Sequence, residues 1–115
     1  MTTSLEEFDY VIVGAGSAGC VLANRLSADK SNKVLLIESG KSDNYFWIPI
    51  PVGYLYTIGN PRTDWCYQTE QDKGLNNRSI GYARGKVMGG CTSINAMIYM
   101  RGQTEDYQEW VKEGS

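Results

Sequence analysis

Three glycines near the amino terminus have the spacing of a phosphate-binding turn. Gly14, Gly16 and Gly19 form the motif G-x-G-x-x-G, directly behind the apolar run 8–13. In such a motif the first glycine permits a tight turn, the second lets the backbone approach a pyrophosphate, and the third lets the next helix pack closely on the strand. Free N–H groups and the dipole at the helix start attract phosphate. The spacing predicts a dinucleotide site; the alternative is a glycine turn in an unrelated α/β protein.

An acidic residue follows where a dinucleotide site needs one. Glu38 lies 24 residues after Gly14 and directly behind the apolar run 34–37. A carboxylate at the end of the second strand accepts hydrogen bonds from an adenosine ribose and repels a 2′-phosphate. This placement favours NAD or FAD over NADP, unless Glu38 is simply a solvated strand end.

A second glycine cluster helps to separate the two remaining cofactors. Gly89 and Gly90 precede a short segment predicted to be helical, which is another place for close backbone approach to a ligand. Residues 41–80 do not repeat the strand–helix–strand pattern of a nicotinamide-binding domain. A cofactor that spans two glycine sites is long, so FAD fits better than NAD. An NAD-dependent dehydrogenase domain remains the alternative, and so does a hinge or tight backbone packing at Gly89 and Gly90.

Two strands and one helix must position these residues. The run 8–13 is β-branched and aromatic and predicts a buried strand, and 34–37 predicts a second one. Apolar residues recur at helical spacing over 17–28. Strands joined by such a crossover are normally parallel. We therefore predict the α/β class, namely a Rossmann-like FAD-binding domain with a parallel sheet, of which 1–115 is the incomplete amino-terminal part.

The middle of the chain has no clean periodicity. Residues 41–83 contain all three prolines and many aromatic residues, so we expect irregular, lid-like structure with short strands near 65–70 and 80–84. The aromatic stretch that begins at Tyr45 is interpreted as a lid, as a membrane-facing patch, or as a loop packed on its own rings. Residues 84–115 hold the second glycine motif. A helix is predicted over 92–100, and another from Thr104, as its N-cap, through Trp110.

Composition narrows the function classes. The chain has 115 residues, a formal net charge of −2 and 42% hydrophobic residues, so we expect no nucleic-acid partner and no transmembrane segment. The start of the chain, 1–7, is polar and acidic and does not resemble a signal peptide. An odd number of cysteines without a C-x-x-C pair favours free thiols, so we expect a cytoplasmic location, with the full-length protein peripheral to a membrane as an option.

The chain resembles the glucose–methanol–choline (GMC) oxidoreductases, in the subgroup of choline-dehydrogenase-like and alcohol-dehydrogenase-like flavoproteins. The resemblance covers essentially the whole chain, and its second glycine cluster is far more specific than the first. It is carried by the segments 9–20, 38–40, 64–70, 84–86 and 89–99, and then by Arg101, Gly102, Asp106, Tyr107 and Trp110.

The resemblance implies an FAD-dependent enzyme that oxidises an alcohol to a carbonyl compound by hydride transfer to the flavin. The electron acceptor, either oxygen or a quinone-type compound, stays open. It implies that Ser17 and Ala18 lie at the pyrophosphate and Glu38 at the ribose. The flavin half would be bound by Gly89, Gly90, Cys91, Asn95, Ala96, Met97 and Ile98, with Trp65 and Arg84 as looser assignments.

The chain departs from the usual pattern of the family at three positions, and it contains no His. Met88 stands where the family usually has Leu, Ile or Val, and Cys91 replaces a commoner Ser or Gly. Some relatives attach flavin through a His at the position of Ile94, so we predict non-covalent FAD. The family's catalytic base is a His in the carboxy-terminal part, and this chain has no His. We therefore predict that it supplies FAD binding only, with base and substrate domain elsewhere; a non-catalytic truncated fragment is the remaining alternative.

Overall fold

The structure is a computed structural model that describes residues 6–114. Most of the acidic start of the chain, on which the signal-peptide prediction was made, lies outside the described residues. None of the helices within 6–114 is long and apolar enough to cross a membrane.

A strand–helix–strand unit opens the fold, as predicted. It consists of β1 (Tyr10–Val13), α1 (Ser17–Leu26) and β2 (Val34–Ile37), with β1 and β2 paired in parallel and Tyr10 opposite Val34. The helix ends two residues earlier than predicted, because a turn stabilised by side chains follows, in which the Asn32 amide donates to the Leu26 carbonyl at 3.0 Å.

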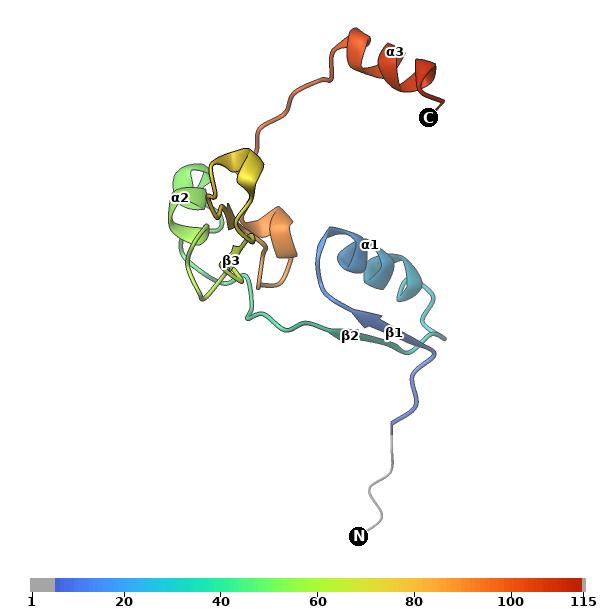
Figure 1. The fold of residues 1–115 in the computed structure, drawn as a ribbon. Helices are drawn as coiled ribbons and strands as arrows, with labels where there is room; N and C mark the ends of the chain where they lie inside the picture. The colour runs from blue at the N-terminus through green and yellow to red at the C-terminus, as the bar shows by residue number, and fades with distance from the viewer. Residues whose placement is uncertain (1–5, 115) are drawn as a thin grey trace.

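The helix covers one face of the two-stranded sheet (Figure 1). The contact is close because Gly19 has no side chain: a Cβ there would lie 1.9 Å from the Gly14 oxygen. The other face is open. Val11 is 55% exposed and Val13 82% exposed, which leaves an apolar sheet face without a cover in residues 6–114.

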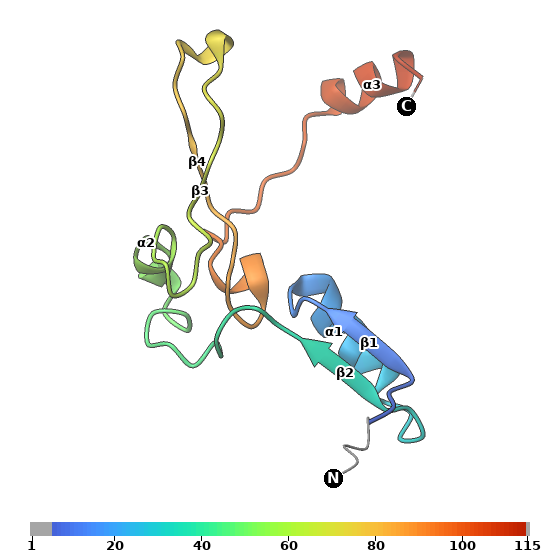
Figure 2. The ribbon, with the colours of Figure 1, turned by 60° about the horizontal axis from the view of Figure 1, so that its bottom comes forward.

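The middle of the chain is largely irregular, as predicted. A 3₁₀ turn leads into the short helix α2 (Tyr54–Thr57), and β3 (Tyr67–Gln68) pairs antiparallel with β4 (Gly81–Tyr82). These strands fall inside the predicted ranges but are only two residues long. Figure 2 shows the chain between them projecting away from the rest of the molecule.

The aromatic stretch packs on itself. The rings of Trp47 and Tyr56 stack at 4.0 Å, and Phe46 meets Trp47 edge-on at 5.0 Å. Gly53 makes room for this, since a Cβ there would lie 1.8 Å from the Trp47 oxygen. The rings of this stretch therefore pack on one another, as the third interpretation expects.

The buried centre lies where the loops meet. Lys41 and Val87 form a parallel bridge, and Asp64 and Gly85 an antiparallel one. Val87 is fully buried there. The first bridge attaches the second glycine segment to the chain that follows β2, and the second bridge attaches it to the middle of the chain.

The prediction of a helix over 92–100 is wrong. The chain makes a 3₁₀ turn at Gly90–Ser93 and is then extended. Local side-chain hydrogen bonds explain this: the Asn95 amide donates to the Thr92 carbonyl at 2.9 Å, and its oxygen accepts from the Met97 N–H at 2.7 Å. Such bonds compete with helix formation, and Met97 itself has a φ of 55°.

The last helix, α3 (Thr104–Lys112), forms as predicted, but its N-cap is Gln103 rather than Thr104. In the capping box of Gln103 and Asp106, the Asp106 carboxylate accepts the Gln103 N–H at 3.3 Å. Figures 1 and 2 show α3 at the end of an extended arm, away from the other elements.

Candidate functional site

The first glycine turn is open on the side that a ligand would approach. Gly14 has a φ of 96°, which a residue with a side chain rarely adopts, and its N–H donates to the Ile37 carbonyl at 2.7 Å. At Gly16 a Cβ would meet nothing within 4 Å. No side chain caps the start of α1, so the N–H groups of its first turn point towards this open space.

The second glycine cluster lies directly against the first. The Gly89 N–H donates to the Ala15 carbonyl at 2.7 Å, and a Cβ at Gly90 would lie 2.9 Å from the Gly16 Cα. The hydroxyls of Ser17 and Thr92 are hydrogen-bonded across the same junction. Two glycine motifs that are far apart in the sequence therefore form one site.

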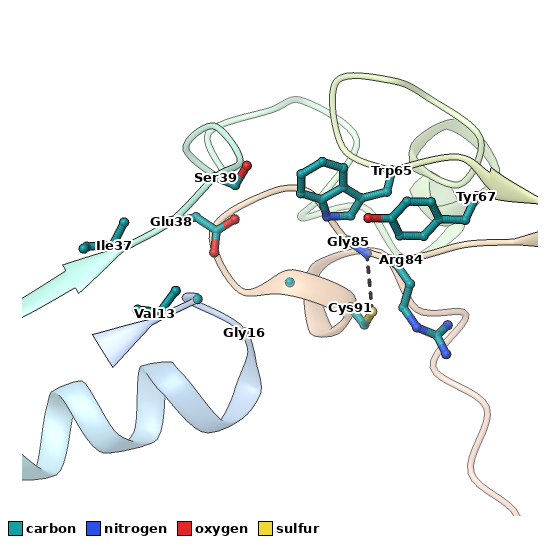
Figure 3. A pocket seen from close by; sticks show the side chains of 12 residues that line it. Val13, Gly16, Ile37, Glu38, Ser39, Trp65, Tyr67, Arg84, Gly85 and Cys91 are labelled. Carbon is teal, nitrogen blue, oxygen red and sulfur yellow. Dashed lines mark hydrogen bonds between the residues drawn. The ribbon is translucent and has the colours of Figure 1, made fainter. Parts of the chain in front are cut away.

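A cleft of about 510 Å³ opens between the two glycine loops and the end of β2 (Figure 3). Seven of the predicted residues line it: Gly14, Gly16, Glu38, Trp65, Arg84, Gly90 and Cys91. The lining also contains five residues that we did not predict: Val13, Ile37, Ser39, Tyr67 and Gly85. The volume is within the range of ligand sites.

Some predicted residues lie beside the cleft rather than in its lining. Ser17, Ala18 and Gly19 belong to the first turn of α1, and Gly89 holds the loop junction. Past the 3₁₀ turn the chain leaves the cleft, and Met97 and Ile98 are 59% and 78% exposed. The stretch assigned to the flavin half, Asn95, Ala96, Met97 and Ile98, is therefore not brought into this lining.

The Glu38 carboxylate links the end of β2 to the first glycine turn. One carboxylate oxygen accepts from the Ala15 N–H and the other from the Gly40 N–H, both at 2.7 Å. These bonds hold the carboxylate at the end of β2, facing the glycine turn. Each carboxylate oxygen can accept more than one hydrogen bond, so the group keeps acceptor capacity for a ligand.

The opposite wall is aromatic. The rings of Trp65 and Tyr67 are parallel within 3°, with centroids 5.8 Å apart, and they lie side by side in Figure 3. The Arg84 guanidinium folds over the Tyr82 ring, 3.7 Å from its centroid. The Arg84 side chain also donates to the Ala83 carbonyl at 2.7 Å.

The family profile described as GMC oxidoreductase matches residues 8–115 of the chain. The chain belongs to the GMC oxidoreductase family. It is 51% identical over 107 residues to the alcohol dehydrogenase [acceptor] of Pseudomonas putida, covering 93% of this chain and 19% of that protein. It is 50% identical over 110 residues to the oxygen-dependent choline dehydrogenase of Staphylococcus xylosus, covering 93% of this chain and 20% of that protein.

Solved structures of the GMC family share the fold. The pyridoxine 4-oxidase of Mesorbium loti superposes with a TM-score of 0.77 at 43% identity, over 92% of this chain and 21% of that one. A formate oxidase of Aspergillus oryzae RIB40 gives the same TM-score at 29% identity, over 95% of this chain and 19% of that one. The chain thus spans about a fifth of the length of these GMC proteins.

Asp64 is a structural residue of the site that we did not single out from the sequence. It is 3% exposed. Its carboxylate accepts backbone N–H groups of Gly59 at 2.7 Å, Cys66 at 3.0 Å and Arg84 at 2.8 Å. Burial alone would raise the pKa of this carboxyl, but the hydrogen bonds outweigh burial and lower the pKa from its ordinary value. Asp64 thereby fixes the backbone on both sides of the aromatic wall.

Cys91 and Ile94 occupy different places although both belong to the second motif. The Cys91 sulfur lies in the cleft and accepts the Gly85 N–H at 3.3 Å, the bond drawn in Figure 3. Ile94 is 3% exposed and packs in the interior. Residues 6–114 contain no group of His, Cys, Asp or Glu arranged to hold a metal ion.

Proposed function

We propose that this chain binds FAD in the cleft between its two glycine loops, as part of a GMC enzyme that oxidises an alcohol to a carbonyl compound. The observation that carries the proposal is the docking of Gly90 against Gly16. This contact brings two glycine motifs together beside a cleft that Glu38 also lines. Bound flavin would supply the hydride acceptor for the reaction.

The residues present fit such a cofactor. The open space at Gly16 and the uncapped start of α1 suit a pyrophosphate, which gives roles to Gly14, Ser17, Ala18 and Gly19. Glu38 faces this turn and would accept the ribose hydroxyls. The backbone of Gly89, Gly90 and Cys91 continues the wall, with Trp65 and Arg84 opposite. We assign Asn95, Ala96, Met97 and Ile98 to the flavin half, on the resemblance alone.

Each of three segments of the chain has its own part in the proposed cofactor binding. We assign ADP binding to 1–40, a lid-like wall to 41–83, and the second glycine motif with its helices to 84–115. No residue of this chain is proposed as the catalytic base, since the sequence contains no His. The base and the substrate domain would lie in the remaining four-fifths of the length of the relatives.

We propose FAD rather than NAD because only FAD accounts for the second glycine loop. Gly89 and Gly90 both have positive φ values, 89° and 57°, and lie against the first turn. An NAD site needs only the first motif and leaves this close junction without a function. The names of the relatives, an alcohol dehydrogenase and a choline dehydrogenase, support an alcohol substrate. The electron acceptor in this proposal is oxygen or a quinone-type compound.

We propose that the FAD is held without a covalent bond. The position used for attachment in some relatives is Ile94, an aliphatic side chain buried in the interior. FAD modification is described for the formate oxidase of Aspergillus oryzae RIB40, and it concerns that protein. Denaturing the full-length protein in acid should release all the flavin into the supernatant; flavin that stays with the precipitated polypeptide would refute this part.

The function itself is tested on the full-length protein. We expect the purified protein to show the visible absorption of oxidised flavin, and this absorption to bleach when a suitable alcohol such as choline is added without an acceptor. A protein that carries no flavin and takes up none would overturn the proposal.

A further inference from the structure

We propose that Lys86 is a positioning residue that holds the Trp65 indole as a wall of the cofactor cleft and strengthens FAD binding through that ring. The inference rests on the proposed function. It starts from the Lys86 ammonium, which lies 4.4 Å from the centroid of the Trp65 ring. That distance is within the range of a cation–π interaction.

The Lys86 ammonium contacts the Trp65 ring but does not line the cleft. Trp65 lines the cofactor cleft (Figure 3), whereas Lys86 does not. Lys86 lines a neighbouring hollow of about 480 Å³ instead. Lys86 therefore contacts the ring without lining the cleft, so we expect any effect of Lys86 on a ligand in the cleft to pass through Trp65.

The hollow beside Lys86 is basic. Lys41 and Arg62 also line it, and none of its lining residues is acidic. The negative face of the indole ring is therefore the attractive partner of the ammonium in this part of the structure.

Both partners sit on constrained backbone. The Lys86 N–H donates to the Thr63 carbonyl at 2.8 Å, and the Trp65 N–H donates to the Arg84 carbonyl at 2.9 Å. Gly40 packs against the Lys86 backbone so closely that a Cβ there would lie 2.2 Å from the Lys86 carbonyl carbon. Because the backbone is fixed, the orientation of the indole ring depends on its side-chain contacts, with Lys86 and with the Tyr67 ring.

The orientation matters because two parallel aromatic rings line the cleft. The rings of Trp65 and Tyr67 lie parallel within 3°, with centroids 5.8 Å apart. FAD contains two planar ring systems, which stack well on aromatic side chains. An indole that turned away would no longer offer its ring to the cofactor, so Lys86 would raise affinity without touching the cofactor.

A double-mutant cycle on the full-length protein tests the inference. FAD affinity of the apoprotein would be measured by quenching of flavin fluorescence for wild type, Lys86→Gln, Trp65→Leu and the double variant. We expect Lys86→Gln to weaken binding by about threefold to tenfold, as a cation–π contact of ordinary strength implies. In the Trp65→Leu background the same change should have no effect, and Lys86→Arg should restore most of the affinity.

Each outcome decides something. An effect of Lys86→Gln that persists without Trp65 would show direct contact with the cofactor and overturn the positioning role. No effect in the wild-type background would overturn it as well. The unfolding temperatures of the apoproteins show whether a variant has a folding defect. If Lys86→Gln fails to fold, Lys86→Met takes its place. Wild-type protein that binds no FAD would instead contradict the proposed function.

Discussion

Gly16 and Gly19 of the first glycine motif differ in what a side chain at each position would contact. At Gly16 a Cβ would point into open space, whereas at Gly19 it would lie 1.9 Å from the Gly14 oxygen. The two residues belong to one motif, yet the first leaves room for a ligand and the second leaves room for the fold. A methyl group at each position separates these roles.

Gly16→Ala in the full-length protein should weaken FAD binding by about tenfold or more, because the new methyl group occupies the space of the pyrophosphate. The fold should tolerate it, with the free energy of unfolding of the apoprotein changed by less than about 1 kcal/mol. Flavin fluorescence titration and chemical denaturation check the two parts.

Gly19→Ala is the matched control. We expect it to lower the free energy of unfolding by roughly 1–3 kcal/mol, since the methyl group collides with backbone that cannot move away. If Gly16→Ala bound FAD as tightly as wild type, the pyrophosphate would not lie at this turn.

Asp64→Asn should destabilise the protein by roughly 1–3 kcal/mol at neutral pH, because a buried carboxylate that accepts three backbone N–H groups is replaced by a neutral amide. The pKa of Asp64 is lowered in the folded state. Its contribution is therefore present above the ordinary pKa of an Asp, about 3.9, and is lost as the pH falls through the folded-state value.

The measurement is denaturant unfolding of wild type and Asp64→Asn over a range from neutral pH to pH values below the ordinary pKa of an Asp, about 3.9. The two stability curves should converge as the pH falls. A difference in stability that is the same at every pH would contradict the role given to the carboxylate charge.

At the scale of elements, the amino-terminal unit was predictable and the loops were predictable only in outline. Strand and helix periodicity, together with glycine spacing, locates β1, α1 and β2 because those signals are local. The role of Asp64 was not predictable, since its partners include the backbone of Arg84, 20 residues away. The helix expected over 92–100 failed because the Asn95 side chain satisfies the backbone locally.

The same limit applies to the site. Sequence spacing identified both glycine motifs and Glu38, and the structure brings them together. The sequence spacing did not identify Ser39 or Tyr67 as cleft residues, because their positions depend on how the irregular middle segment packs. Nor did it show that the stretch from Asn95 to Ile98 leaves the cleft lining.

The junction between β2 and the second glycine loop can be broken at one position. Gly40→Ala would place a Cβ 2.2 Å from the Lys86 carbonyl carbon, so we expect a loss of roughly 1–3 kcal/mol in unfolding free energy. Gly81→Ala is the control, because the nearest atom to its Cβ would be 3.7 Å away. Equal stabilities of the two variants, measured by denaturant unfolding, would contradict the close approach.

At the scale of the whole molecule, the chain is expanded. Its radius of gyration is 19.3 Å, against about 13 Å for a compact domain of this length. Large apolar side chains are exposed on separate surfaces, with Val13 82% and Val111 72% exposed. The relatives are about five times longer than this chain, so we expect additional GMC sequence to cover these surfaces.

The central claim is that the two docked glycine loops bind FAD. The most direct measurement is the unfolding temperature of the full-length apoprotein with no cofactor, with FAD and with NAD at equal concentration, because a ligand that binds the folded state raises that temperature. We predict a clear increase with FAD and none with NAD. An increase with NAD alone, or with neither cofactor, would contradict the account.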